Sequence, residues 1–225
     1  MAAEDRLRTY RAKRGFERTR EPADEGREAA DEGREAAGGG REPSAAQDAG
    51  GRGGGRPRFV VQIHDARRMH FDFRLQVGDV LKSWSVPRGP SADPGDKRLA
   101  VPTEDHPLAY EDFEGVIPKG QYGGGTVIVW DRGTYEPLSH DRQGRPVDFA
   151  GSLARGHATF RLHGAKLRGE YALTRFRGRD GEDAWLLVRK GAARRAGHGS
   201  PDPRRARSVR TGRTLAQVAA DGGAR

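Results

Sequence analysis

The sequence predicts a mainly β protein, either an antiparallel barrel or a sandwich. Eight short segments carry alternating or β-rich apolar residues, and clusters of glycine, proline and aspartate separate them. Few stretches have the 3.6-residue period that a long helix requires. The eight expected strands cover residues 59–64, 69–77, 80–86, 98–102, 125–130, 157–162, 170–176 and 184–189. A few short helices complete the prediction, one of them over residues 214–220.

Composition divides the chain into four parts. Residues 1–22 form a charged N-terminal arm, and residues 23–55 are rich in glycine and charge, which is typical of a flexible linker. The expected strands place the folded domain at residues 56–191. Residues 192–225 form a basic C-terminal tail with eight basic and two acidic side chains. We therefore expect one compact domain with flexible N- and C-terminal tails.

Composition also excludes several classes of protein. The chain has no cysteine, which excludes a disulfide framework and a thiolate metal site. No apolar run has the length of a signal peptide or a membrane span, so we expect a cytoplasmic protein with no membrane partner. The net charge of +9 favours a polyanionic partner, most simply nucleic acid.

The expected strand over residues 69–77 has two chemically different faces. Its odd-numbered residues are apolar, whereas His70, Asp72 and Arg74 fall on the other face, because side chains alternate along a strand. The preceding strand alternates too and places His64 on its polar face. If the two strands lie side by side, both histidines and the aspartate can converge on one metal ion, with the arginine beside it.

Two histidines and one carboxylate leave coordination positions open for water and substrate, which suits catalysis better than structural support. An iron oxygenase is an open alternative, because the facial triad of jelly-roll oxygenases also starts with His-x-Asp. That class needs a distal histidine, for which the chain offers His106, His157 and His163. The arginines near the predicted ligands favour a phosphoryl substrate over dioxygen, since a guanidinium matches two phosphate oxygens.

A second group of polar residues lies in an expected loop over residues 104–110. His106 could donate a proton to a leaving oxygen or hold a phosphate oxygen. Glu104 could orient a neighbouring histidine or arginine. The glycine-rich residues 113–125 lack the ending of a P-loop, so we interpret them as a tight connection into the next strand.

Several motifs in order resemble the 3′-phosphoesterase domain of bacterial DNA ligase D. The opening motif is Phe-Val-Val-Gln-Ile-His-Asp-Ala-Arg-Arg-Met-His-Phe-Asp-Phe-Arg-Leu at residues 59–75. The resemblance covers roughly residues 56–190, and its later motifs lie at residues 81–90, 97–101, 104–108, 113–118 and 130–133.

The resemblance implies a compact β-barrel with a crescent-shaped cleft and a manganese-dependent hydrolase, with Co²⁺ as another candidate ion. Members of the family clean DNA 3′ ends during break repair by end joining. They remove a 3′-phosphate, and they remove a terminal 3′ ribonucleoside so that a polymerase or ligase can use the end.

The resemblance also implies roles for individual residues. Metal ligands are expected at His64, His70 and Asp72. Phosphate contacts, which count among the catalytic groups, are expected at Arg74, Arg98 and His106. Glu104 is expected to support these groups, and Arg88 and Tyr110 to contribute to phosphate binding. Many members have lysine where this chain has Arg88.

The N-terminal arm resembles the family as well. Arg14 and Glu21 match functional positions of the arm, which supports ribonucleoside removal in family members. Gly15 stands where an aspartate is usual, so phosphomonoesterase activity is expected more firmly than phosphodiesterase activity.

The expected partners are DNA 3′ ends, with ligase and polymerase activities supplied by separate proteins, and Ku as a further partner. We expect a monomer associated with the bacterial nucleoid. A non-catalytic module that binds DNA ends remains the second alternative, because the basic tail alone is compatible with it.

Overall fold

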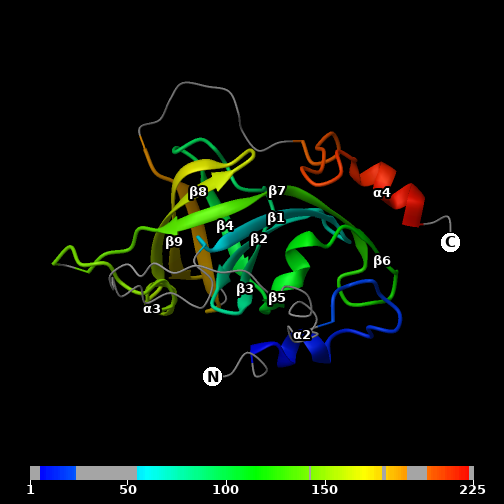
Figure 1. The fold of residues 1–225 in the computed structure, drawn as a ribbon, viewed down its shortest axis with the longest axis horizontal. Helices are drawn as coiled ribbons and strands as arrows, with labels where there is room; N and C mark the ends of the chain where they lie inside the picture. The colour runs from blue at the N-terminus through cyan, green and yellow to red at the C-terminus, as the bar shows by residue number, and fades with distance from the viewer. Residues whose placement is uncertain (1–5, 24–54, 142, 179–180, 192–201, 223–225) are drawn as a thin grey trace, which may run out of the picture.

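Eight strands close into an antiparallel barrel in the computed structural model, which describes residues 6–23, 55–141, 143–178, 181–191 and 202–222. The ring runs β1-β2-β3-β4-β10-β9-β8-β7, and pairing of β7 with β1 closes it (Figure 1). Its strands are β1 (Arg58–Asp65), β2 (His70–Val77), β3 (Val80–Val86), β4 (Lys97–Pro102), β7 (Gly125–Pro137), β8 (His157–Gly164), β9 (Arg168–Arg177) and β10 (Asp183–Arg189). Two short strands extend the sheet: β5 (His106–Pro107) pairs with β3, and β6 (Gly115–Ile117) pairs with β7.

Apolar side chains of the ring fill the barrel interior. Phe160 lies near the middle of this core, and its ring centroid is 6.0 Å from those of Phe73, Tyr135 and Phe149. Tyr171 stacks on it at 6.4 Å. Aromatic rings bury large apolar areas, so this cluster contributes strongly to the stability of the barrel.

The outer face of β1 is buried as well, so the whole strand from residue 59 to residue 64 is shielded from solvent. Val60 belongs to a second apolar cluster that includes Leu7 and Tyr10 of the N-terminal arm and Tyr110. The arm and the short helix η1 (Leu108–Asp112) therefore cover the outer face of the barrel next to β1 and β3. Burial on both faces explains why β1 is an almost continuous apolar run.

Three other short helices lie around the barrel in the described part of the chain (Figure 1). They are α2 (Arg8–Ala12) in the N-terminal arm, α3 (Phe149–Ala154) against β8, and α4 (Leu215–Gly222) against β6 and β7. None of the described helices is long and apolar enough to cross a membrane.

The predicted mainly β barrel with a few short helices is confirmed. Each expected strand is present, and the expected helix over residues 214–220 corresponds to α4. The sequence did not predict β5, β6 or α3, which are too short to show a clear period.

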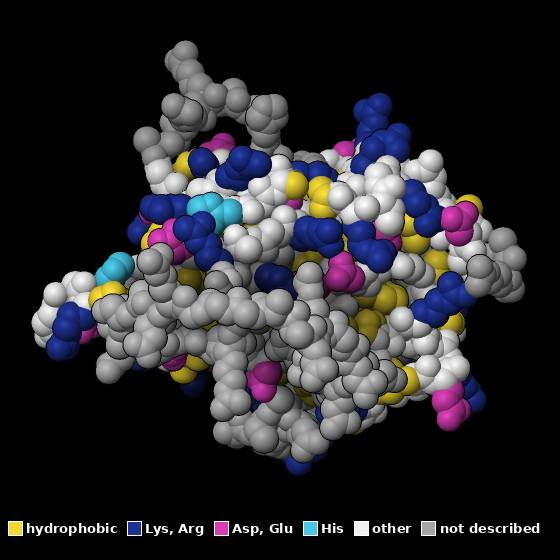
Figure 2. Space-filling view, viewed as in Figure 1, with side chains coloured by type: hydrophobic (Ala, Val, Ile, Leu, Met, Phe, Trp, Pro, Cys, Tyr) yellow, Lys and Arg dark blue, Asp and Glu magenta, His cyan; other side chains and the backbone are white. Residues whose placement is uncertain are grey.

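Parts of both predicted tails pack against the barrel. Residues 6–23 of the arm cover β1, and the segment 202–222 lies on β6 and β7, with Val209 N donating to Val129 O at 2.9 Å. Figure 2 shows Lys and Arg side chains gathered where this basic segment lies at the upper right. Residues 1–5 of the predicted arm, residues 24–54 of the predicted linker, and residues 192–201 and 223–225 of the predicted C-terminal tail lie outside the described residues.

Replacing Phe160 with alanine should lower the free energy of unfolding by about 3–5 kcal/mol, because it removes a ring at the centre of the core. Phe176→Ala is a matched control, since Phe176 is 38% exposed and should cost less than about 1 kcal/mol. Urea denaturation followed by tryptophan fluorescence measures both. Equal losses in the two variants would contradict this description of the core.

Candidate active site

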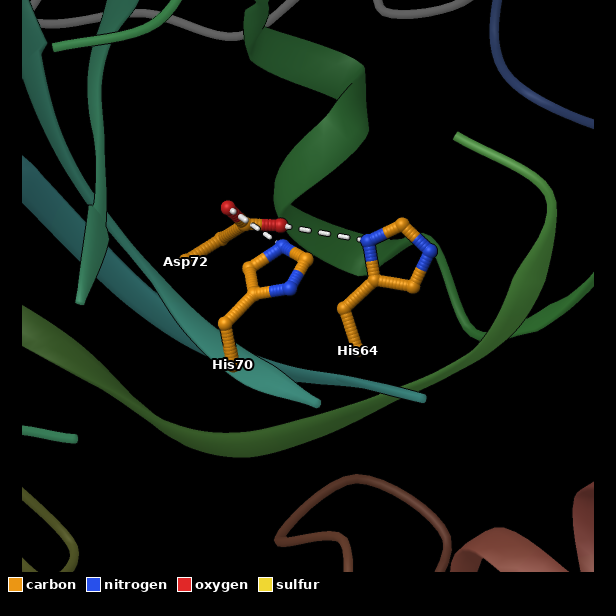
Figure 3. A group of neighbouring side chains, drawn as sticks. All are labelled: His64, His70 and Asp72. Atoms are coloured by element: carbon orange, nitrogen blue, oxygen red, sulfur yellow. Dashed lines mark ion pairs between the residues drawn. The ribbon is translucent and has the colours of Figure 1, made fainter. Parts of the chain in front are cut away.

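Antiparallel pairing of β1 with β2 brings the three predicted metal ligands together. His64 lies opposite His70 in the register, and Asp72 lies two residues further along β2. Asp72 Oδ2 is 3.7 Å from His64 Nδ1, and Asp72 Oδ1 is 3.5 Å from His70 Nε2 (Figure 3). One ligand atom from each residue lies within 4.8 Å of the others, so the three side chains form a compact triad.

Backbone carbonyls hold the far nitrogen of each histidine. His64 Nε2 donates to Gly123 O at 2.8 Å, and His70 Nδ1 donates to Arg68 O at 2.8 Å. A carbonyl oxygen only accepts, so the proton of each neutral ring is on the nitrogen that faces the carbonyl. The lone pairs of His64 Nδ1 and His70 Nε2 therefore point towards the carboxylate of Asp72.

This donor set fits a divalent metal ion. Two lone pairs that face a carboxylate repel it unless a proton or a cation lies between them. Ligand atoms held at about 2.0–2.2 Å from one ion lie at most about 4.4 Å apart. The two separations between histidine and carboxylate, 3.5 and 3.7 Å, meet this limit, and all three ligand atoms lie within 4.8 Å of one another. Carbonyls that fix histidine tautomers in this way are the common outer support of metal sites.

Arg74 is buried beside the triad and is held by several partners. Its Nε donates to Gln62 Oε1 at 2.9 Å, its Nη1 donates to Ser83 Oγ at 2.8 Å, and its Nη2 donates to Asp72 Oδ2 at 3.1 Å. Its Nη1 also lies 2.9 Å from His106 Nδ1. The Arg74 side chain is only 3% exposed, so water screens its charge weakly and its interactions with neighbouring charges are strong.

This charge keeps the Asp72 carboxylate ionised. Burial by itself raises the pKa of Asp72, but the neighbouring groups, with the charge of Arg74 first among them, hold that pKa well below its usual range. The triad therefore offers a permanent negative charge to a cation.

His106 faces two arginines instead of the triad. Its Nδ1 lies beside Arg74, and its Nε2 lies 3.3 Å from Arg14 Nη2. Burial and then the charges of both arginines hold the pKa of His106 well below its usual range, so the ring is neutral. A neutral imidazole in this position has no spare proton to give to a leaving oxygen.

The N-terminal arm reaches this part of the site through Arg14. Its Nε donates to Glu21 Oε1 at 2.9 Å, and its Nη1 donates to Glu104 Oε1 at 3.1 Å. Lys13 also pairs with Glu104, at 3.2 Å. Tyr110 OH donates to Glu21 Oε1 at 2.9 Å, so this hydroxyl anchors the arm. The predicted positions Arg14, Glu21, Glu104 and Tyr110 thus form one network with His106.

Arg88 and Arg98 lie outside this network. Arg98 Nη2 donates to Asp96 Oδ2 at 2.6 Å, whereas its buried Nε has no hydrogen-bond partner among the described residues. Arg88 is exposed in the turn after β3. Neither arginine has a hydrogen bond or ion pair with the triad in the described contacts. His157 and His163, candidates for the distal histidine of an oxygenase, are likewise absent from the described triad.

The sequence did not predict the role of the glycine-rich turn between β6 and β7. Gly123 has φ +73° and supplies the carbonyl that holds His64. A Cβ at Gly124 would lie 2.9 Å from Pro118 O, and one at Gly125 would lie 2.3 Å from Asp65 O. Only glycine allows this turn to pack so closely beside the triad.

Gln62 is a second functional position that was missed. Its Nε2 donates to Tyr110 O at 3.0 Å and to Phe113 O at 2.9 Å, while its Oε1 accepts from Arg74. The amide thereby joins β1 to the loop that carries the arm network. Its place two residues before His64 on an otherwise apolar strand was the available signal.

The barrel is similar in sequence to part of several known proteins. The family model of the DNA ligase D 3′-phosphoesterase domain matches residues 62–175. The chain is 52% identical over 132 residues to the multifunctional non-homologous end joining protein LigD of Pseudomonas aeruginosa; that match covers 59% of this chain and 15% of the relative. It is 44% identical over 131 residues to the LigD of Mycobacterium tuberculosis, covering 58% of this chain and 16% of the relative.

A longer match extends beyond the barrel core. The chain is 35% identical over 188 residues to the LigD of Mycolicibacterium smegmatis, covering 82% of this chain and 20% of that relative. The chain therefore spans about a fifth or less of the length of these relatives.

Replacing His70 with alanine should abolish stoichiometric binding of Mn²⁺, because it removes one of three ligands and leaves Asp72 facing a single histidine. Isothermal titration calorimetry measures this. His163→Ala, an exposed histidine outside the triad, should bind the ion as wild type does. Unchanged Mn²⁺ affinity in His70→Ala would contradict the assignment of the metal site.

Proposed function

The chain belongs to the DNA ligase D 3′-phosphoesterase domain family, and from that premise we propose that it is a metal-dependent phosphoesterase that processes DNA 3′ ends. The proposed reactions are removal of a 3′-phosphate and removal of a terminal 3′ ribonucleoside. The single observation that carries the metal dependence is the approach of His64 Nδ1 and His70 Nε2 to within 3.7 and 3.5 Å of the buried carboxylate of Asp72.

The proposed ligands are His64, His70 and Asp72, with Mn²⁺ or Co²⁺ as the expected ion. When bound, such an ion supplies a Lewis acid for a phosphoryl oxygen and lowers the pKa of a bound water. In the proposed removal of a 3′-phosphate, water attacks phosphorus, the bond from phosphorus to the 3′ oxygen breaks, and that oxygen takes up a proton. In the proposed removal of a ribonucleoside, water attacks phosphorus, the bond to the 5′ oxygen of the ribonucleoside breaks, that oxygen takes up a proton, and the phosphate stays on the strand.

Buried charge gives the other site residues their proposed roles. Arg74 keeps Asp72 ionised and adds positive charge beside the phosphoryl group. Of the two roles expected for His106, we propose that it positions a phosphate oxygen, because its neutral ring lies between two arginines.

Phosphate binding is proposed to extend to Arg88, Arg98 and Tyr110. The buried Nε of Arg98 has no partner among the described residues, and buried donors are ordinarily paired. An anionic oxygen would satisfy this donor. Arg88 is exposed, so its side chain is free to move towards a phosphate group and pair with it. Tyr110 contributes indirectly, because its hydroxyl holds the N-terminal arm through Glu21.

The proposed biological setting is break repair by end joining, in the cytoplasm beside the nucleoid. The relatives are named as non-homologous end joining proteins, and the net charge of +9 suits a DNA partner. A ligase, a polymerase and Ku are the proposed protein partners, and the chain is proposed to act as a monomer.

Asp72→Asn should reduce Mn²⁺-dependent removal of a 3′-phosphate by more than about 100-fold, because the amide lacks the charge that holds the ion. The assay resolves a 5′-labelled primer–template with a 3′-phosphate on a denaturing gel, with and without Mn²⁺. Asp183→Asn, at an exposed carboxylate, is the control. DNA binding without turnover in the wild type would favour the non-catalytic module instead.

Gly15→Asp should raise removal of a 3′ ribonucleoside relative to removal of a 3′-phosphate, because it restores the residue usual in the family. The position has room, since a Cβ would meet only Gln121 Oε1, at an ordinary 3.5 Å. Gly15→Asn controls for size without charge. Parallel rates on substrates with a 3′-phosphate and with one terminal ribonucleotide measure the ratio, and an unchanged ratio would show that the aspartate has no role here.

A further inference from the structure

Four large apolar side chains remain exposed among the described residues. Leu99, Val101, Tyr122 and Phe176 are 44%, 41%, 48% and 38% exposed. Tyr122 lies in the turn next to Gly123, the partner of His64. Leu99 and Val101 lie on β4, and Phe176 lies on β9. In the order of the sheet, these strands follow β3 and lie away from β1.

Strand register places these three residues on the outer face of the barrel. Ala100, Trp185 and Leu187 belong to the interior core, so their neighbours in β4 and β10 point outward. Leu186 lies opposite Leu99, and Ala184 lies opposite Phe176. The resulting outer surface, here called the apolar shelf, consists of Leu99, Val101, Ala184, Leu186, Val188 and Phe176.

The apolar shelf is aligned with Asp72 across neighbouring strands of the sheet. Asp72 lies opposite Ser85 on β3, and Ser85 lies opposite Val101 on β4. Neighbouring strands are about 4.8 Å apart, so the shelf begins about 10 Å from Asp72. This distance corresponds to about three base steps of a stacked strand. The described helices α3, α4 and η1 pack against other strands and leave the shelf uncovered.

We propose that the apolar shelf binds nucleobases that begin about three base steps upstream of the reacting 3′ end, an inference that rests on the proposed function. We place the terminal phosphate of a DNA strand at the triad, so that the rest of this DNA strand runs along the outer face of the β-sheet. Towards β4, β10 and β9, this face is apolar and exposed. Bases stack on aromatic and apolar side chains, and the ring of Phe176 offers such a surface.

Charge at the margin of the shelf suits the same ligand. Lys97 lies opposite Val188 at the end of β4 and is exposed, and Arg88 is exposed in the turn between β3 and β4. Both cations can form ion pairs with phosphates of the DNA backbone while the bases contact the shelf. The six shelf side chains carry no hydrogen-bonding group, so they cannot read base edges. The shelf therefore binds without sequence preference, as an enzyme that processes varied DNA ends requires.

The test compares two labelled single-stranded oligonucleotides with a 3′-hydroxyl, in EDTA so that nothing turns over. One has bases throughout, and the other is abasic at the fourth, fifth and sixth positions upstream of the 3′ end, which are the positions that the spacing of the strands places over the shelf. Fluorescence anisotropy should show that the wild-type chain binds the first at least about 5-fold more tightly. In the double variant Leu99→Ser, Phe176→Ser, that preference should disappear while affinity for the abasic strand stays unchanged. Phe176→Tyr should retain the preference.

Three outcomes would overturn the proposal. They are a wild type without preference for the base-bearing strand, a double variant that keeps the preference, and a double variant that loses affinity for both strands equally. Sedimentation provides a fourth, because self-association of the wild type that the double variant abolishes would assign the shelf to a second copy of this chain.

The enzyme assay separates this proposal from the proposed function. Hydrolysis of a nucleoside 3′-phosphate, which is too short to reach the shelf, should be equal in the wild type and the double variant. Absence of all hydrolysis with a retained base preference would sink the proposed function and leave the shelf standing. Normal hydrolysis without a base preference would sink the shelf alone.

Discussion

The buried guanidinium of Arg74 is the interaction on which the site depends. It joins β2 to β1 through Gln62 and to β3 through Ser83, and it neutralises Asp72. An isolated buried carboxylate would take up a proton, and a protonated Asp72 would offer no charge to a cation. The charge of Asp72 therefore depends on its ion pair with Arg74. Burial strengthens this ion pair, and removal of Arg74 would leave a buried carboxylate without a partner.

Burial of an outer barrel face makes this ion pair possible. The N-terminal arm and η1 cover that face, and they bring Arg14 and Tyr110 against His106. The arm is thus a structural part of the site as well as a source of functional groups. An arm that left the surface would expose Arg74 to water and weaken its effect on Asp72, since charges interact less strongly in a high dielectric.

Local patterns predicted the strands and the three side chains that the structure brings together in the triad, whereas the sequence did not predict the long-range contacts. Alternation identified every strand of the ring and placed His64 and His70 on polar faces, and the structure adds the register that sets them opposite each other. Closure of the barrel involves a register shift of β1 against β7 between Val61 and Gln62, which alternation does not reveal. The carbonyl of Gly123 holds His64 across 59 positions, and backbone partners leave no side-chain signal in a sequence.

The balance of charge in the site is a second, independent argument for a metal ion. Around the triad, three cations form ion pairs with three anions: Lys13, Arg14 and Arg74 with Glu21, Glu104 and Asp72. The histidine between the arginines is neutral. The ion pairs therefore leave little surplus positive charge for a phosphate monoester, which brings more than one negative charge into a region where burial strengthens every interaction. A divalent ion on the triad would restore that surplus at the position proposed for a phosphoryl oxygen, so the balance of charge supports the metal dependence that we propose from the ligand geometry.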